Sequence, residues 1–343
     1  MNAVLPAFAT MHPASFALVM ATGIVSIACR LLGWRWLAEA LLWANVLFYG
    51  VLWVLTVARI VRFPERVLAD ISHHGRAVGF FTTVAATCVL GTQAFIIRGA
   101  WAIAVSLWLL GIVLWAVVTY TVFTVLTVKA EKPPLAEGVN GGWLVAVVAA
   151  QSVCVLGAQL ADGFGASAPN LLLFCLCMWL GGGMLYIWII SLIFYRYTFF
   201  TMSPSDLSPP YWVNMGAVAI STLAGTMLIA AAPRSPLLSD LLPFLKGLTL
   251  LFWATATWWI PMLVILGVWR HVYRRFPLRY DPLYWGAVFP LGMYTVCTLR
   301  LAQAIDAPVL LVIPRVSFYV AVAAWLLAMT GLVREVARHV FRV

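Results

Sequence analysis

The residues best placed to do chemistry are Phe289 and Pro290, adjacent in the middle of an apolar stretch whose predicted N-cap and first helical residue are Asp281 and Pro282. Proline has no N–H to donate to the carbonyl of Gly286, so we expect the helix to bend here. A bent helix frees backbone polar groups, which a membrane tolerates only beside protein or a water-filled path. The ring of Phe289 would project into that path as a plug; the alternative is a core phenylalanine beside an ordinary proline kink.

The first apolar stretch has the same character, because Pro13 lies near its beginning and Gly23 in its middle. Small and hydroxyl-bearing residues recur along this stretch and along the third, fifth, seventh and ninth, where they permit close helix packing and can line a wet cavity. Hydroxyl groups, and N–H groups freed at kinks, can select anions without a buried cation. The candidate lining residues are Phe16, Thr22, Ser26, Thr83, Thr87, Ser152, Ser221 and Thr295, and the candidate kinks along the path are Pro13, Gly23, Gly286 and Pro290.

A positive charge at the mouth of such a path would concentrate anions there. Arg300, near the end of the ninth stretch, is the best candidate for this mouth charge. Two other interpretations stay open, because the same position would suit an arginine that extends to the lipid headgroups or one that pairs with Asp306.

Other kinds of site have no support in the sequence. The five histidines lie outside the centres of the apolar stretches, and the adjacent His73 and His74 lack the spacing that zinc needs. A glycine pattern at Gly163 and Gly165 follows no strand, and the H-E-x-x-H, Walker and G-x-S-x-G motifs are absent. The sequence therefore predicts no metal, no cofactor and no enzymatic activity. The net charge of +10 is scattered over short loops, which argues against a nucleic-acid partner.

The elements that position the candidate residues must be membrane helices. The chain of 343 residues is 64% hydrophobic and 9% charged, whereas soluble domains are about 25% charged. Apolar stretches of about 20 residues, enough to cross about 30 Å of hydrocarbon, recur through what we interpret as one transmembrane domain, residues 1–343, in a lipid bilayer. The ten predicted spans are 11–31, 36–58, 77–97, 100–128, 141–161, 169–195, 211–231, 244–269, 283–304 and 309–333.

The basic residues orient these spans. With the N-terminus in the cytoplasm, 14 of the 21 lysines and arginines fall on the inner side and seven on the outer side, as the positive-inside rule requires. No cleavable signal peptide is evident. We therefore expect both termini in the cytoplasm and a multi-pass protein of a cell (inner) membrane, which the short loops favour.

The spacing of the spans indicates how they are arranged. The odd-numbered spans begin about 64 to 72 residues apart, as though one two-helix hairpin recurred five times, although no matching residue motif is evident between hairpins. Thirteen of the 17 tryptophans lie in the even-numbered spans, and large aromatic residues suit lipid-facing positions. These patterns predict an all-α integral membrane protein of ten transmembrane helices in five hairpins, with five inner helices lining a central pore and five outer helices around them.

Two motifs resemble a known family. The pattern P-x-x-F-x-x-x-M-x-T-G-I-x-S, beginning at Pro13, is similar to the first span of the tellurite-resistance/dicarboxylate transporter family, and the W-x-x-x-F-P segment beginning at Trp285 is similar to its ninth. That family includes slow-type anion channels and malate and sulfite transporters. The resemblance implies a central pore, a homotrimer and an aromatic gate, which the second motif assigns to Phe289. The fifth span departs from the family because it lacks a helix-bending proline.

These observations favour membrane transport of small inorganic or carboxylate anions. All eleven acidic residues lie away from the middle of a span, whereas pumps and symporters generally place an ionisable group there. We therefore expect passive conduction through an uncharged, gated central pore, as in an anion channel. The alternative is a C4-dicarboxylate transporter for malate or succinate, in which a coupled proton could travel on the substrate itself.

Overall fold

The computed structural model describes residues 7–340, and within this range the chain forms helices and no strands. Ten helices have 15 or more residues: α1 (Ala17–Leu31), α2 (Arg35–Arg62), α5 (Phe81–Arg98), α6 (Trp101–Val128), α8 (Val145–Leu160), α9 (Ala168–Phe199), α10 (Val213–Ala231), α12 (Leu242–Val268), α13 (Trp285–Ala304) and α14 (Val312–Val340). Shorter helices lie in the connections: α3 (Pro64–Ile71), α4 (His74–Ala77), α7 (Leu135–Gly138) and α11 (Pro236–Asp240).

Eight segments of the described chain are long and apolar enough to cross a membrane. One of them, Gly141–Phe199, contains both α8 and α9, between which Gly165 leaves helical geometry with φ 49°. Helix α13 is not among the eight, since Arg300, Gln303 and two glycines make it less apolar. The structure thus supports a multi-pass helical membrane protein, whereas the ten predicted crossings stay a prediction.

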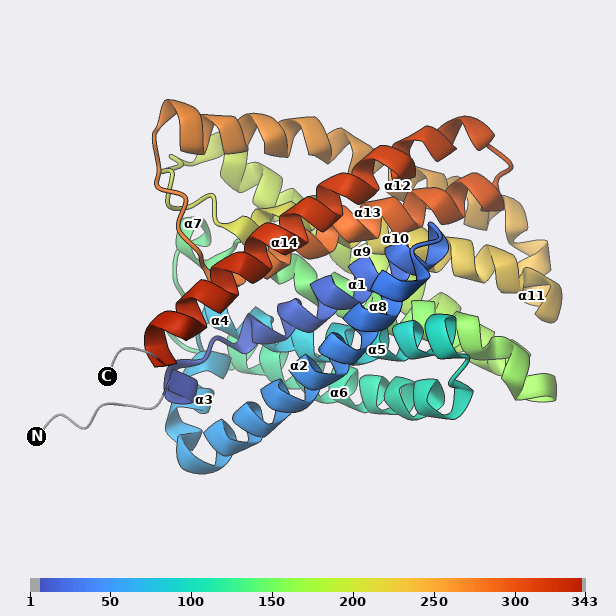
Figure 1. The fold of residues 1–343 in the computed structure, drawn as a ribbon, viewed down its shortest axis with the longest axis horizontal. Coiled ribbons are helices and arrows are strands. Elements are labelled where there is room, and N and C mark those ends of the chain that lie inside the picture. Colours follow the sequence, from blue (N-terminus) through green and yellow to red (C-terminus); the bar gives the residue numbers. More distant parts are fainter. Residues whose placement is uncertain (1–6, 341–343) are drawn as a thin grey trace, which may run out of the picture.

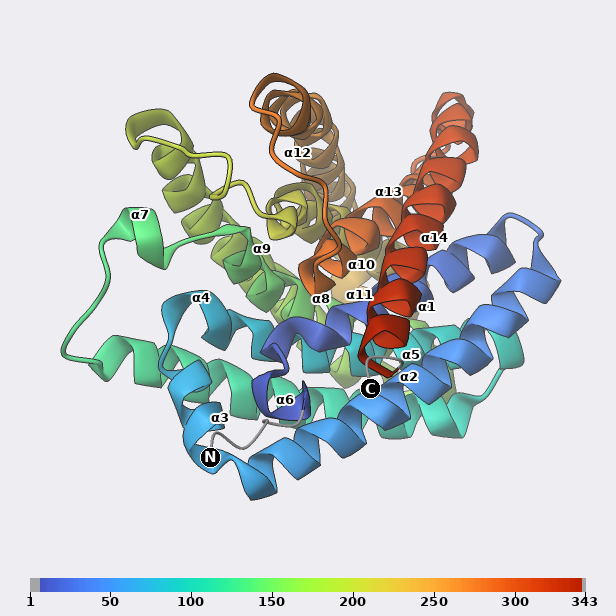
Figure 2. The same cartoon turned by 60° about the vertical axis from the view of Figure 1, so that its left-hand side comes forward.

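Five of the long helices, α1, α5, α8, α10 and α13, are buried along most of their length. They form a closed ring, here called the inner ring, in which α1 packs on α5, α5 on α8, α8 on α10, α10 on α13, and α13 back on α1. The outer helices α2, α6, α9, α12 and α14 surround this ring (Figure 2) and expose large apolar side chains such as Trp36, Leu47 and Leu327. Such a surface is suited to lipid.

Tryptophans of the outer helices also attach them to the inner ring. Four indole N–H groups donate to a residue of an inner helix: Trp108 to Val153, Trp179 to Ser221, Trp253 to Thr298 and Trp325 to Thr22. The prediction that tryptophans of the even-numbered spans face lipid is correct for Trp36 but wrong for Trp108 and Trp179, which are buried. A buried indole needs an acceptor for its N–H, and the inner ring supplies one.

The two ends of the inner ring differ. All five inner helices begin at the end where α3, α4 and α7 lie, here called the α4 end, and α11 lies at the opposite end (Figure 1). A short 3-10 turn leads into each inner helix: Pro13–Phe16, Val78–Phe80, Gly141–Leu144, Pro209–Trp212 and Pro282–Tyr284. The turn Ala7–Thr10 and the last turn of α14 lie at the α4 end as well (Figure 1).

Candidate functional site

Two cavities lie inside the inner ring, and each is lined by residues from all five of its helices or the turns into them. The larger, here called the vestibule, has a volume of about 70 Å³ and lies at the α4 end. It is lined by His12, Ala14, Ala17, Met20, Gly75, Val78, Gly79, Thr82, Asn140, Gly142, Val145, Val148, Ser208, Pro210, Val213, Leu283, Gly286 and Phe289. The second cavity, of about 20 Å³, is lined by Ile24, Ile27, Leu31, Cys88, Val89, Thr92, Ile96, Ser152, Val155, Gln159, Ile220, Leu223, Met293, Val296 and Arg300.

The two cavities follow one another along the same helix faces. On α13 the vestibule ends at Phe289 and the second cavity begins at Met293, and on α8 the corresponding residues are Val148 and Ser152. Residues four apart in a helix lie one turn apart on the same face. The cavities are therefore successive parts of one axial path, and Phe289, which is 1% exposed, lies where they meet.

Four of the predicted site residues line this path. Gly286 and Phe289 line the vestibule, and Ser152 and Arg300 line the second cavity. The Ser152 hydroxyl donates to the carbonyl of Val148 at 2.7 Å, so its proton is already used and its oxygen remains as an acceptor.

The other predicted lining residues point elsewhere. Five contact outer helices through their side chains: Phe16 packs on Trp53, Thr22 accepts from Trp325, Ser26 donates to the carbonyl of Ala38, Thr87 shares a hydrogen bond with Tyr49, and Thr295 shares one with Ser317. The remaining two, Thr83 and Ser221, donate to backbone carbonyls three and four residues earlier. In the described chain, none of these seven residues lines the vestibule or the second cavity.

The predicted kink positions take part in packing. The carbonyl of Pro13 accepts from the Thr82 hydroxyl at 3.2 Å. Pro290 lies inside α13, whose helical geometry continues through it, and its ring packs against Gly216 of α10. At the start of this region the Asp281 carboxylate accepts from the N–H of Leu283 at 2.7 Å, so the predicted N-cap is confirmed.

Gly23 lies where α1 packs closely against α2 and α5. A Cβ at this position would be 2.5 Å from Val89 Cγ1 and 3.0 Å from Asn45 Nδ2. We therefore expect Gly23→Ala to lower the free energy of unfolding by about 1–3 kcal/mol through overpacking. Gly181→Ala is the matched control, since nothing lies within 4 Å of its new methyl group. Equal unfolding temperatures for the two purified variants would contradict this packing role.

Arg300 is half-buried and lies near the α11 end of the path. Its guanidinium donates to Gln303 Oε1 at 3.2 Å. Among the ion pairs of residues 7–340, none joins Arg300 to Asp306. The position of Arg300 beside the second cavity fits the predicted mouth charge.

The sequence-based prediction omits three polar residues of the vestibule that precede the turns into inner helices, at what is here called the rim of the vestibule. His12, Asn140 and Ser208 are the N-cap residues of three turns into inner helices. In the sequence each is followed by proline or glycine, as Asp281 is followed by Pro282. An N-cap residue directly before such a residue marks a helix start, so this repeated signal could have found them. Thr82, Thr92 and Gln159 line the path without any comparable signal.

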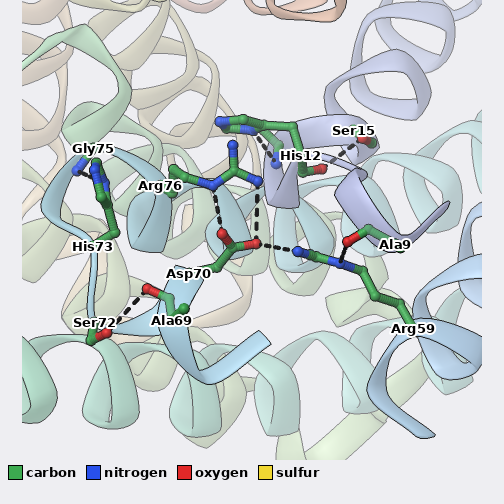
Figure 3. A network of polar contacts seen from close by, with 11 residues as sticks. Ala9, His12, Ser15, Arg59, Ala69, Asp70, Ser72, His73, Gly75 and Arg76 are labelled. Carbon is green, nitrogen blue, oxygen red and sulfur yellow. Dashed lines mark hydrogen bonds and ion pairs between the residues drawn. The ribbon is translucent and has the colours of Figure 1, made fainter. Parts of the chain in front are cut away.

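A buried network of charges lies beside the vestibule (Figure 3). Asp70 accepts from Arg59 at 2.7 Å and from Arg76 at 2.5 Å, and Arg59 Nε donates to the carbonyl of Ala9 at 3.3 Å. Arg59 and Asp70 are only 4% and 6% exposed. The network ties the end of α2 to α3, α4 and the segment before α1, and thereby holds the backbone that carries His12.

A second buried arginine makes a similar connection. Arg196, in the last turn of α9, donates to the carbonyl of Val139 at 2.6 Å and to the Tyr211 hydroxyl, and lies 3.9 Å from Asp206. Val139 and Tyr211 precede α8 and α10, so Arg196 holds two segments of the rim. Like Arg59, Arg196 lies three residues before the end of an outer helix, with its aspartate about ten residues later. An arginine near the end of the outer helix, with an aspartate in the loop that follows, thus occurs in two of the hairpins.

Membrane helices arranged around an axial path define the class of this protein, a membrane transport protein. The chain belongs to the SLAC1 family: the family model, described as a voltage-dependent anion channel, matches residues 10–333. The predicted membership of the tellurite-resistance/dicarboxylate transporter family, which is the same family, is thereby confirmed.

Similar proteins span bacteria, archaea and fungi. An uncharacterized membrane protein of Mycobacterium tuberculosis is 39% identical over 160 residues, which cover 46% of this chain and 80% of that protein. An uncharacterized transporter of Methanocaldococcus jannaschii is 24% identical over 293 residues, 82% of either chain. A sulfite efflux pump of Trichophyton rubrum is 23% identical over 326 residues, 88% of this chain and 84% of the pump. The family is thus one of anion transporters and channels rather than enzymes.

Proposed function

We propose that this protein conducts small anions passively along the axis of the inner ring and that Phe289 closes the path. The observation that carries the proposal is the pair of cavities, each lined from all five inner helices, that meet at a buried phenylalanine ring. A largely neutral path suits conduction, because an ion must be able to leave it as readily as it enters. A single apolar ring that interrupts such a path suits a gate.

The electrostatics of the vestibule favour anions over cations. All five inner helices begin at the α4 end, so the partial positive charges of their N-termini face the vestibule. No aspartate or glutamate is among the described residues that line either cavity. Arg59, Arg76 and Arg196 lie nearby, but Asp70, Asp206 and Asp281 offset their charge, so the helix N-termini carry the preference for anions.

In the arrangement we propose, the ten long helices cross a cell inner membrane as five hairpins, with both termini and the vestibule on the cytoplasmic side. The support for this orientation is the excess of lysine and arginine in the loops of the α4 end. We also propose a homotrimer, which the family resemblance supports, with the exposed apolar faces of the outer helices in contact with lipid or neighbouring copies.

A proton-coupled C4-dicarboxylate transporter is the alternative. Two carboxylates are best held by cationic, preferably bidentate, partners. Among the described residues that line the two cavities, Arg300 is the one arginine or lysine. This scarcity of cationic partners favours conduction of small monovalent anions over binding of malate or succinate.

Flux measurements in proteoliposomes distinguish the two functions. We expect chloride and nitrate to move down their gradients at rates that do not depend on a pH gradient, because no carboxylate that could carry a proton is among the described residues lining the path. Sulfite and malate should be compared in the same vesicles, with protein-free liposomes as the control. Flux that is selective for malate and requires a pH gradient would contradict the channel and support the coupled carrier.

A further inference from the structure

The rim of the vestibule presents hydrogen-bond donors from three separate connections of the chain. His12 precedes the turn into α1, Asn140 precedes the turn into α8, and Ser208 precedes the turn into α10. All three residues line the vestibule and are half-buried. The three residues therefore line one cavity, each from a different connection of the chain.

The bonds that these side chains already make leave their donor groups free. His12 Nδ1 accepts from the N–H of Ala14 at 3.0 Å, so the proton of a neutral ring lies on Nε2. Asn140 Oδ1 accepts from the N–H of Gly142 at 2.8 Å, which leaves the Nδ2 group as donor. Among the hydrogen bonds of the described chain, none uses His12 Nε2, Asn140 Nδ2 or the Ser208 hydroxyl.

His12 lies just before the first membrane segment, Pro13–Leu31, and its neighbours keep its ring neutral. Burial and the nearby Arg76 lower the pKa of His12 from 6.5 to about 4; Arg59 acts in the same direction, and the carboxylates of Asp70 and Asp281 do not outweigh these effects. Asp70 is engaged by both arginines, and Asp281 caps the turn into α13. At pH 7, His12 is therefore a neutral donor, and neither carboxylate is among the residues lining the vestibule.

We propose that His12, Asn140 and Ser208 bind one small oxyanion, of the carboxylate, nitrate or sulfite type, at the entrance to the vestibule. The proposal rests on the conduction proposed above, since it names where the anion binds before it reaches Phe289. Three donors from different connections of the chain suit an ion with several acceptor oxygens, and hydrogen bonds to an ionised acceptor are stronger than those between neutral groups.

Asn140→Asp is the sharpest test of this site. Aspartate keeps the acceptor that caps the turn into α8, but it replaces the free donor by a negative charge. Binding of ¹³C-formate to the full-length protein in detergent micelles, followed by NMR line broadening at pH 7, is expected to weaken on the order of tenfold or more. Ser208→Ala removes a hydroxyl that has no capping bond, so it should weaken formate binding severalfold without disturbing the fold.

Thr201→Asp is the matched control, because it adds the same charge at an exposed position in the loop that follows α9. Unchanged formate binding in Asn140→Asp, or an equal loss in Thr201→Asp, would overturn the site, as would wild-type protein that leaves the formate line unbroadened. Nitrate and sulfite should displace formate, whereas displacement by chloride at equal concentration would overturn the preference for oxyanions. The measurement needs no bilayer, so failure here is distinct from failure of flux to respond to Phe289→Ala.

Discussion

Phe289→Ala is expected to raise the passive flux of chloride and nitrate in proteoliposomes by on the order of tenfold or more. The ring lies where the vestibule ends and the second cavity begins, and it is 1% exposed. Alanine at this position would remove most of the apolar volume that separates the two cavities. Anion efflux measured for wild type and variant at matched protein content tests the expectation.

Phe81→Ala is the matched control for this experiment. Phe81 is also fully buried, but its ring packs against Phe123 of the outer helix α6 and does not line either cavity. Both substitutions should cost about 3–5 kcal/mol of stability, so both should lower the yield of folded protein. A flux increase in both variants would indicate a general loosening of the helices, and an increase in neither would leave Phe289 as a core residue.

Much of the fold could be predicted because the relevant signals are local. The predicted span 211–231 corresponds to α10 (Val213–Ala231) with its preceding turn, since apolar length and proline positions act within one segment. Asp281 was recognisable as an N-cap because capping involves residues only two or three positions apart. The burial of the odd-numbered helices followed from their small residues, which allow close packing.

Most of the residues that line the path could not be predicted, because nearly every face of an inner helix is buried. Thr22 and Ser152 look alike in the sequence, yet Thr22 accepts from a tryptophan of α14 and Ser152 lines the second cavity. A hydroxyl in a helix can also bond to the carbonyl of the preceding turn, as that of Ser221 does, and then requires no wet surface. Which face meets an outer helix depends on partners distant in the sequence, and Trp325 lies 303 residues from Thr22.

Removal of the Asp70 carboxylate is expected to have a large effect on stability. Asp70→Asn would leave Arg59, which is 4% exposed, without its buried counter-ion, and removal of one partner of a buried ion pair costs about 3–5 kcal/mol. Glu39→Gln is the control, because Glu39 and Arg98 form an ion pair whose side chains are 36% and 51% exposed, and such pairs contribute about 0–1 kcal/mol. Thermal unfolding in detergent should show a much larger decrease for Asp70→Asn.

The pH dependence of the stability lost in Asp70→Asn provides a second test. Burial alone would raise the pKa of Asp70, but hydrogen bonds from Arg76 and Arg59 lower it below its ordinary value of 3.8. A carboxylate whose pKa is lower in the folded state stabilises the protein at neutral pH and loses that effect as the pH falls through the folded pKa. The difference in thermal stability between wild type and Asp70→Asn should therefore be largest at pH 7 and should decrease below about pH 4. A stability difference that does not change with pH would mean that Asp70 acts through its shape and hydrogen bonds rather than through its charge.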